Sequence, residues 1–206
     1  MTRILGLACG SLAVSLMALA TPVSAQTAQT QTAQSSQWTH GTTLDLFGGA
    51  ALAPSADMRA ALGGTIGWEV NHHVGIEGAG TWVVPREHDQ AFMAELKGVF
   101  NLTSPNAAVP FVGAGVGMYL ATFDVGSSSI PAFYQPRMTS APAGSSQSFT
   151  DPSLILTGGF NIMTSRHVSS KPEVSVRWVL HDSNSYAVTV LAVHAIYHFE
   201  DHGIGR

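Results

Sequence analysis

Three histidines near the end of the chain have a spacing that could bind a metal ion. His194, His198 and His202 repeat every four residues, which on a helix would place them on one face as ligands. The residues around them alternate between apolar and polar, which is the pattern of a strand. His194 and His198 would then point to the same side about 13 Å apart. That separation is too large for one ion, so the sequence predicts neither a metal site nor a cofactor.

Six charged residues form a second group that could do chemistry. Each lies near the middle of an apolar segment, where an isolated charge is costly unless it is paired. We expect them to face a common interior as an ion-pair network, with Lys97 and Arg177 against the four glutamates. A polar pathway for small solutes is the functional alternative. The six residues are Glu69, Glu77, Glu95, Lys97, Glu173 and Arg177.

The first 25 residues have the pattern of a secretory signal peptide. Arg3 precedes an apolar stretch over residues 4–20, and small residues follow up to Ala25. We predict a signal peptide over residues 1–25, cleaved after Ala25, with a retained N-terminal anchor as the alternative. The single cysteine, Cys9, lies inside this segment. The remaining chain therefore offers no disulfide, no thiolate nucleophile and no cysteine-bound metal.

The charge balance excludes one class of partner. Nine Lys and Arg face thirteen Asp and Glu, for a net charge of -4, which counts against nucleic acid as a partner. Only 11% of the residues are charged, against roughly 25% in soluble domains, so much of the surface is expected to face something other than water. After residue 25 no window of about 18 apolar residues could form a spanning helix. A membrane protein of this sequence must cross with strands.

The elements that position these residues are short and regularly spaced. Residues 26–37 form a polar, low-complexity leader without residues to bury. From Trp38 onward, short apolar runs are separated by turn residues, as in consecutive β-hairpins. We predict an all-β fold over residues 38–200, an up-and-down transmembrane barrel of about eight antiparallel strands with a polar lumen, and a short tail over residues 201–206. The predicted strands are 39–51, 60–71, 74–84, 91–102, 109–123, 153–163, 172–181 and 187–199.

Alternation along these segments separates an apolar face from a partly polar face. In 172–181, Val174 and Val176 alternate with Glu173, Ser175 and Arg177. A soluble barrel would turn its polar face to water and a membrane barrel would turn it to the lumen. So few charges suit a small lumen better than a water-facing surface. A closed barrel also pairs every backbone group, as lipid requires.

Connection lengths and aromatic residues agree with a membrane barrel. Outer-membrane barrels have short turns on one side and longer loops outside, and the predicted loop 124–152 is much the longest connection. We expect this loop to be the contact surface. Eight aromatic residues lie near predicted strand ends, as in the aromatic girdles that mark membrane interfaces. They are Trp38, Trp82, Phe100, Phe111, Phe123, Trp178, Tyr197 and Phe199.

Three glycine-rich or turn-containing stretches carry a family resemblance. Residues 73–78, 110–119 and 158–174 resemble the bacterial outer-membrane β-barrel proteins of the OmpA/OmpX-like type, with a small porin-like barrel domain. The resemblance implies outer-membrane lipid as surroundings, the barrel-insertion machinery as a partner during assembly, and location in the outer membrane of a Gram-negative-type bacterium. The last strand, ending at Phe199, is similar to the family's C-terminal insertion signal, although seven residues follow it here.

A second resemblance concerns the polar segment after the seventh predicted strand. Residues 181–184, His-Asp-Ser-Asn, resemble the His-x-Ser-Asn stretch of lipid A 3-O-deacylase barrels, which implies His181 as base and Ser183 as nucleophile. The glutamate that orients the histidine in that family is missing, because the next glutamate is Glu200. We therefore expect no enzyme, but a structural or surface-interaction barrel with an unknown surface ligand. A narrow solute pore and a lipid A esterase are the alternatives.

Overall fold

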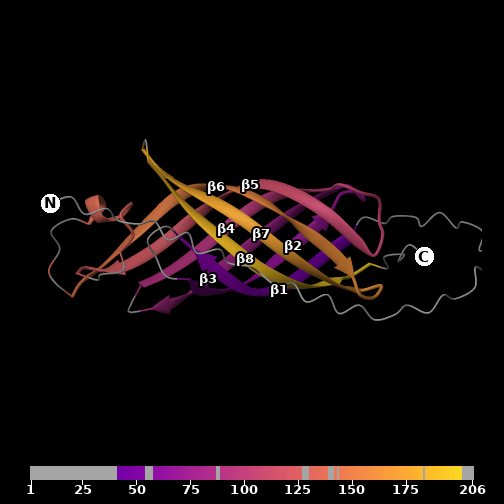
Figure 1. Cartoon of the computed structure of the whole chain (residues 1–206), viewed down its shortest axis with the longest axis horizontal. Helices are drawn as coiled ribbons and strands as arrows, with labels where there is room; N and C mark the ends of the chain where they lie inside the picture. Colours follow the sequence, from indigo (N-terminus) through magenta and orange to yellow (C-terminus); the bar gives the residue numbers. More distant parts are fainter. Residues whose placement is uncertain are drawn as a thin grey trace, which may run out of the picture. The chain divides into compact units, whose positions relative to one another are not determined.

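The computed structural model describes residues 41–53, 58–86, 89–126, 130–138, 142, 144–182 and 184–200. The predicted signal peptide, leader and C-terminal tail lie outside these residues. Within them eight antiparallel strands form a closed barrel in which each strand pairs with the next (Figure 1), which confirms the predicted fold class. The elements are β1 (Gly41–Leu52), β2 (Arg59–Glu69), β3 (Val74–Arg86), β4 (Asp89–Asn101), β5 (Ala108–Asp124), the 3₁₀ turn η1 (Gln135–Arg137), β6 (Ser146–Met163), β7 (Val168–His181) and β8 (Asn184–His198).

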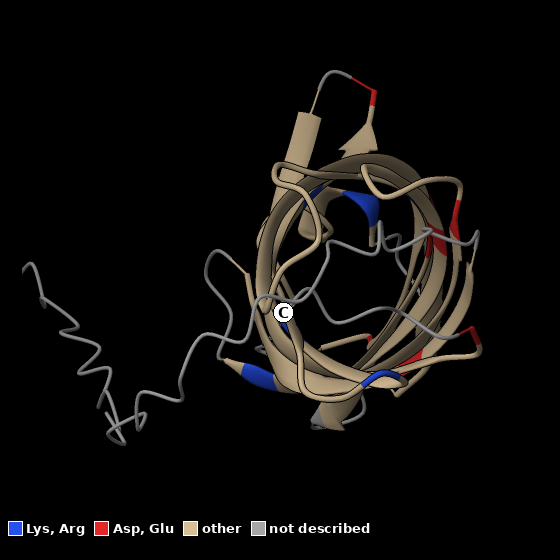
Figure 2. Cartoon of the chain, turned by 90° about the vertical axis from the view of Figure 1, so that its right-hand side faces the viewer, with Lys and Arg blue, Asp and Glu red and all other residues tan. Residues whose placement is uncertain are grey.

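The barrel is closed by the first and last strands. β1 pairs with β8 from Thr43 opposite His198 to Leu52 opposite Thr189, and Figure 2 shows the resulting ring along the barrel. Because the barrel is closed, every strand pairs with a neighbour on both sides and the sheet has no edge strand.

Short polar turns join the strands at one end, which we call the inner end. The Asn71 side chain accepts hydrogen bonds from the backbone N–H groups of His73 and Val74. Asn106 accepts one from Ala108, and Ser165 one from Val168. Such side-chain turns fix the short connections 70–73, 102–107 and 164–167. The opposite, outer end holds η1 and the tip of the β7–β8 hairpin.

Side chains alternate between the outside and the interior of the barrel. Even-numbered residues of β1 to β7 and odd-numbered residues of β8 point outward, and between the strand ends none of them is charged. Large apolar side chains are exposed on every strand; Leu46, for example, is 70% exposed. No helix among the described residues is long and apolar enough to cross a membrane.

Two strands begin at least four residues earlier than the sequence predicted. β6 starts at Ser146 rather than at residue 153, because it pairs with β5 from Asp124 opposite Ser146 onward. β7 starts at Val168 rather than at residue 172. The predicted loop 124–152 is therefore too long, and the connection spans residues 125–145. The serines and threonines at the start of β6 are typical of a loop sequence, but they alternate with Phe149, which is buried and faces the interior.

Candidate functional site

The interior of the barrel divides into a charged half near the inner end and an apolar half near the outer end. The charged groups of the first half come from β1, β3, β4, β7 and β8. The groups buried there include five cationic or ionisable basic side chains and several carboxylates, held in mutual contact. They are Asp45, Glu95, Lys97, Lys171, Glu173, Arg177, His194 and His198, with the carboxylate of Glu77 only slightly more exposed.

Lys97 is the centre of the charged half. Its ammonium group lies 2.8 Å from Glu173, 3.3 Å from Glu77 and 3.9 Å from Glu95. The side chain is 1% exposed, so these carboxylates replace water around the charge. Arg177 lies 2.7 Å from Glu95. Removing one partner from such a cluster would leave a buried charge without compensation.

Lys171 is a second buried cation in the same cluster. Its ammonium group donates to both carboxylate oxygens of Glu77 at 2.9 Å and lies 3.3 Å from Glu173. It also lies 5.4 Å from the centre of the Phe111 ring. Sequence reasoning missed Lys171 because the residue fell in a predicted turn. In the barrel it belongs to β7, opposite His194 of β8.

Two histidines extend the network. The Nδ1 of His194 lies 3.1 Å from Asp45, and its Nε2 lies 3.7 Å from Glu173. The Nε2 of His198 shares a 2.8 Å hydrogen bond with the Ser169 hydroxyl. The two rings thus have separate partners. Among the described residues no three His, Cys, Asp or Glu side chains gather as metal ligands, and His202 lies outside them.

The six charged residues singled out in the sequence all lie on the inward parity of their strands. Glu77, Glu95, Lys97, Glu173 and Arg177 are linked through the contacts above. Glu69 lies at the inner end, 3.9 Å from the Nδ1 of His198. Sequence reasoning placed His194 and His198 on the inward face without counting them in the cluster, and it missed Asp45 and Lys171.

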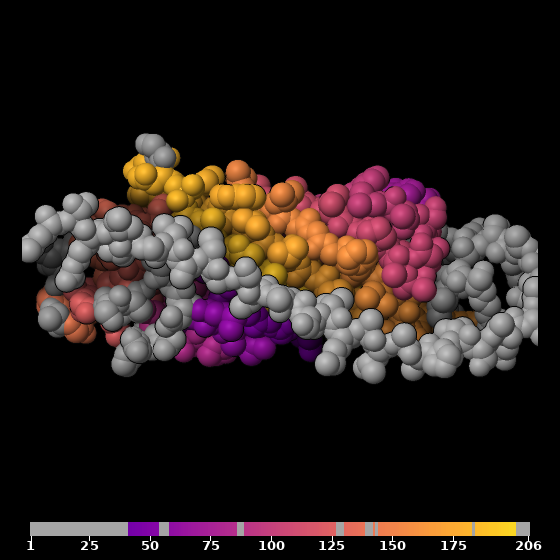
Figure 3. Space-filling view, in the orientation of Figure 1, coloured from indigo at the N-terminus to yellow at the C-terminus, as the bar shows by residue number. Residues whose placement is uncertain are grey.

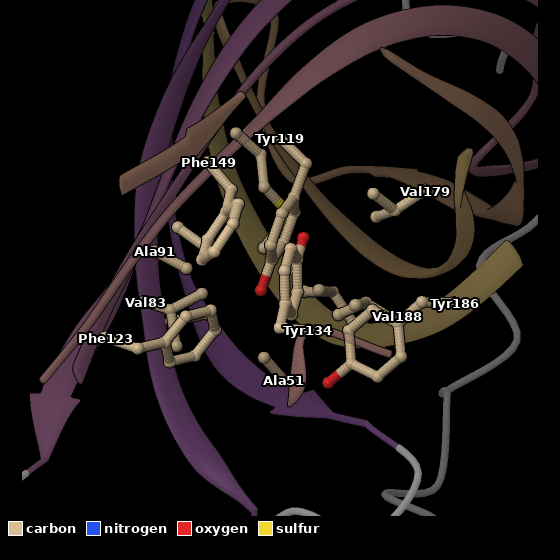
Figure 4. Packing of buried hydrophobic residues seen from close by; sticks show 14 of the residues in the cluster. Ala51, Val83, Ala91, Tyr119, Phe123, Tyr134, Phe149, Val179, Tyr186 and Val188 are labelled. Carbon is tan, nitrogen blue, oxygen red and sulfur yellow. The ribbon is translucent and has the colours of Figure 1, made fainter. Parts of the chain in front are cut away.

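The outer half of the interior is mainly apolar, apart from the buried residues Asp89 and Asp151, and is closed by part of the long connection. Tyr134 is fully buried there, with its ring 4.9 Å from Phe123, 5.0 Å from Phe149 and 6.0 Å from Tyr186. Figure 4 shows these rings together with smaller side chains such as Val83 from the barrel wall. Burial raises the pKa of the Tyr134 phenol above its usual range, so this side chain, the centre of a plug formed by residues 130–138, is uncharged.

A polar clamp holds this plug to the barrel wall. Arg137 donates two hydrogen bonds to the carboxylate of Asp151, at 2.8 and 2.9 Å. The guanidinium group also lies 4.7 Å from the centre of the Phe149 ring. Asp151 is only 2% exposed, and the Nδ1 of His181 lies 3.3 Å from it on the other side. η1, β6 and β7 are thereby joined by one buried carboxylate.

The candidate catalytic residues are only partly placed. His181 lies at the outer end of β7 with its side chain 39% exposed, and its Nε2 lies 3.5 Å from Asp182. Ser183 lies outside the described residues. Asp151 lies 3.3 Å from the Nδ1 of His181, so the structure places an acid beside the histidine where the sequence offered none nearby. No sequence signal indicated it, since Asp151 is 30 residues away in the chain and fell in a predicted loop.

Aromatic side chains form two rings on the outside of the barrel, and the sequence assigned their members imperfectly. Phe111 and Phe123 are buried, so the prediction that they belong to the outer surface is wrong: their odd numbers place them on the inward parity of β5. Trp38 lies outside the described residues. Near the outer end the outward aromatics are Trp82, Phe92 and Trp178, and near the inner end they are Trp68, Phe100, Phe160, Tyr197 and Phe199.

Comparison with known proteins supports the fold alone. By sequence, no protein-family model and no curated protein matches the chain. The structure is similar to Neisserial surface protein A, with a TM-score of 0.57 and 13% identity over 78% of this chain and 97% of the other. It is also similar to the N-terminal β-barrel domain of Pseudomonas aeruginosa OprF, with a TM-score of 0.54 and 11% identity over 77% of this chain and 100% of the other. The resemblance to small outer-membrane barrels is thus confirmed for the fold.

Proposed function

We propose that the chain is an integral barrel of the outer membrane with a structural or surface-interaction role, and that its interior does not conduct. The observation that carries the proposal is the outward face: between the strand ends it holds no charged residue, while the charged groups of the strands point inward. Water would favour the reverse arrangement, whereas lipid requires this one. Membrane lipid is therefore the surrounding partner that the surface fits.

The distance between the outer and inner groups of outward aromatic residues supports a membrane location. Phe92 of the outer group and Phe100 of the inner group both lie on β4. They are separated by eight residues, or about 27 Å along a strand. With the usual tilt of about 40°, that length spans roughly 20 Å of height, close to the apolar band of known outer-membrane barrels. The apolar surface is therefore only slightly shorter than the band of about 25 Å found on outer-membrane barrels.

The filled interior is the reason for proposing a closed barrel over a pore. Lys97, Lys171 and Arg177 with their carboxylates occupy the inner half, and Tyr134 occupies the outer half. An eight-stranded barrel leaves only enough room for side chains. We expect no stable conductance steps from the purified protein in planar bilayers. Regular steps that change on neutralising Lys97 would instead support the pore.

A charge on the outward face tests the membrane location. Leu156 is 53% exposed on β6, and Leu156→Arg is expected to destabilise the barrel in lipid vesicles by about 2–4 kcal/mol. Ser148→Arg, on the same face of β6 but near the outer end, is the matched control and should cost little. The measurement is urea unfolding in vesicles, followed by the difference in gel mobility between unboiled and boiled samples. Equal stability of both variants, or no mobility shift for the wild type, would contradict the proposal.

Assembly and surface contact follow from the same proposal. The last strand, β8, and Phe199 just after it would be read by the barrel-insertion machinery, with the signal peptide directing secretion. The outer rim, rather than a free loop, would be the contact surface, because Tyr134 and Arg137 hold part of the long connection against the barrel. Deleting residues 130–138 should lower the stability of the barrel but leave it inserted in the membrane, and should change surface binding.

A second candidate function, ester hydrolysis at the outer rim, is favoured by one observation. The buried Asp151 holds the Nδ1 of His181 at 3.3 Å, as an orienting acid holds a catalytic base. The test is the mass of lipid A in cells that express the wild type, Ser183→Ala or His181→Ala. Removal of an acyl chain by the wild type alone would support the esterase. An unchanged mass of lipid A in all three kinds of cells would contradict the esterase function.

A further inference from the structure

A groove at the outer rim lies between η1 and the tip of the β7–β8 hairpin. Its volume is about 770 Å³, within the range of small-molecule sites. The hairpin tip projects at the upper left of Figures 1 and 3, at the same end as η1. We propose that this groove binds the neutral sugar rings of a glycan. The inference rests on the proposed function, because it requires the outer end to face the cell surface.

One side of the groove offers apolar, flat surfaces. Phe133 from the long connection covers the buried Tyr186, with ring centres 5.6 Å apart, and the Arg137 guanidinium group lies 5.7 Å from the centre of the Phe133 ring, so the flat surface open to a ligand is that of Trp178. Trp178 lines the groove beside the small residue Ala187, which is its cross-strand partner. Aromatic faces with a polar rim suit ligands that are apolar on one side and polar on the other. The C–H face of a sugar ring is such a surface.

The other side of the groove offers hydrogen-bonding groups of both kinds. His181, Asp182, Asn184 and Ser185 line it at the hairpin tip. Together they present an amide, a hydroxyl, a carboxylate and an imidazole, which include both donors and acceptors. Sugar hydroxyls donate and accept at the same time, so they can satisfy such a mixed set. An alkyl chain that covered these exposed groups would displace their water without replacing its hydrogen bonds, which is costly.

The charges around the groove disfavour a phosphate or sulfate group. The lining cation Arg137 is bound by both oxygens of Asp151, so its charge is already balanced. Asp182 is 84% exposed and lies 3.5 Å from the Nε2 of His181, which adds a negative charge where an anion would sit. A ligand rich in hydroxyl groups and without net charge fits this balance best.

Saturation-transfer NMR on the folded barrel tests the proposal. The protein is kept in an N-oxide detergent, which carries no sugar headgroup, and is titrated with lactose, cellobiose, mannobiose and chitobiose. Irradiating the aromatic protons should transfer magnetisation to the C–H protons of at least one disaccharide. Trp178→Ala should weaken that binding at least tenfold. Trp82→Ala removes a tryptophan from the same outer ring but away from the groove, and should leave binding unchanged.

Further arms identify the source of the sugar and the outcomes that overturn the proposal. Binding of free disaccharides indicates a soluble or cell-surface glycan, whereas binding only to glycolipid in nanodiscs indicates a lipid headgroup; both support a sugar site. No transfer from any of these probes, equal loss in both tryptophan variants, or binding only of sulfated sugars would overturn it. The mobility shift on heating is measured on every sample. A folded, non-conducting barrel that binds no sugar refutes this inference and leaves the proposed function intact.

Discussion

Replacing Lys97 with methionine removes the central cation of the buried cluster while keeping a side chain of similar length. Three carboxylates lose a contact, those of Glu173, Glu77 and Glu95, at 2.8, 3.3 and 3.9 Å. Breaking a buried ion pair typically costs about 3–5 kcal/mol. Each of the three carboxylates keeps one other cation. Glu77 and Glu173 keep Lys171, and Glu95 keeps Arg177. We therefore expect a loss of stability near the lower limit, about 3 kcal/mol.

The assay is reversible urea unfolding in lipid vesicles, followed by tryptophan fluorescence and by the difference in mobility between folded and unfolded protein on gels. A double-mutant cycle with Glu173→Gln measures the interaction energy of the Lys97–Glu173 pair apart from the other contacts of the cluster. Because Lys97→Met leaves one carboxylate too many, the double variant should recover at least 1 kcal/mol relative to the sum of the single variants. A loss below 1 kcal/mol for Lys97→Met, or additive effects in the double variant, would refute the view that the cluster is a satisfied network.

Two further substitutions test the plug and the wall. Tyr134→Ala should destabilise the barrel by about 3–5 kcal/mol, because a buried aromatic ring is lost, and should make the long connection accessible to protease. Gln135→Ala, at the exposed neighbouring residue, is the control. Equal protease sensitivity of the two variants would contradict the role of Tyr134 as a plug. Gly159→Ala should prevent the heat-dependent mobility shift, because the added Cβ would collide with the carbonyl oxygen of Pro172. Gly78→Ala, where the added Cβ has room, should fold normally, and a folded Gly159→Ala would show that the strands can separate there.

The sequence by itself determined the fold class and most of the charged interior. Strand side chains alternate with a period of two, so each apolar run fixes which residues share a face without knowledge of the partner strand. That local rule placed Glu77, Glu95, Lys97, Glu173 and Arg177 on the polar faces of their strands, the small number of charges indicated that these faces turn inward, and the structure brings the residues into contact. It also separated the outward apolar surface from the lumen.

Only the tertiary structure decided how the long connection and the strand ends are used. Lys171 looked like a turn residue, but pairing of β7 with β8 draws it into the ladder. The burial of Tyr134 depends on a connection folding back over the barrel mouth, whereas Asp151 meets His181 because β6 and β7 pair in the register that sets Ser153 opposite Val179. Such contacts join residues without any periodic relation in sequence, because they are set by the shape of the closed barrel. For the same reason the rim groove could not be read from the chain alone.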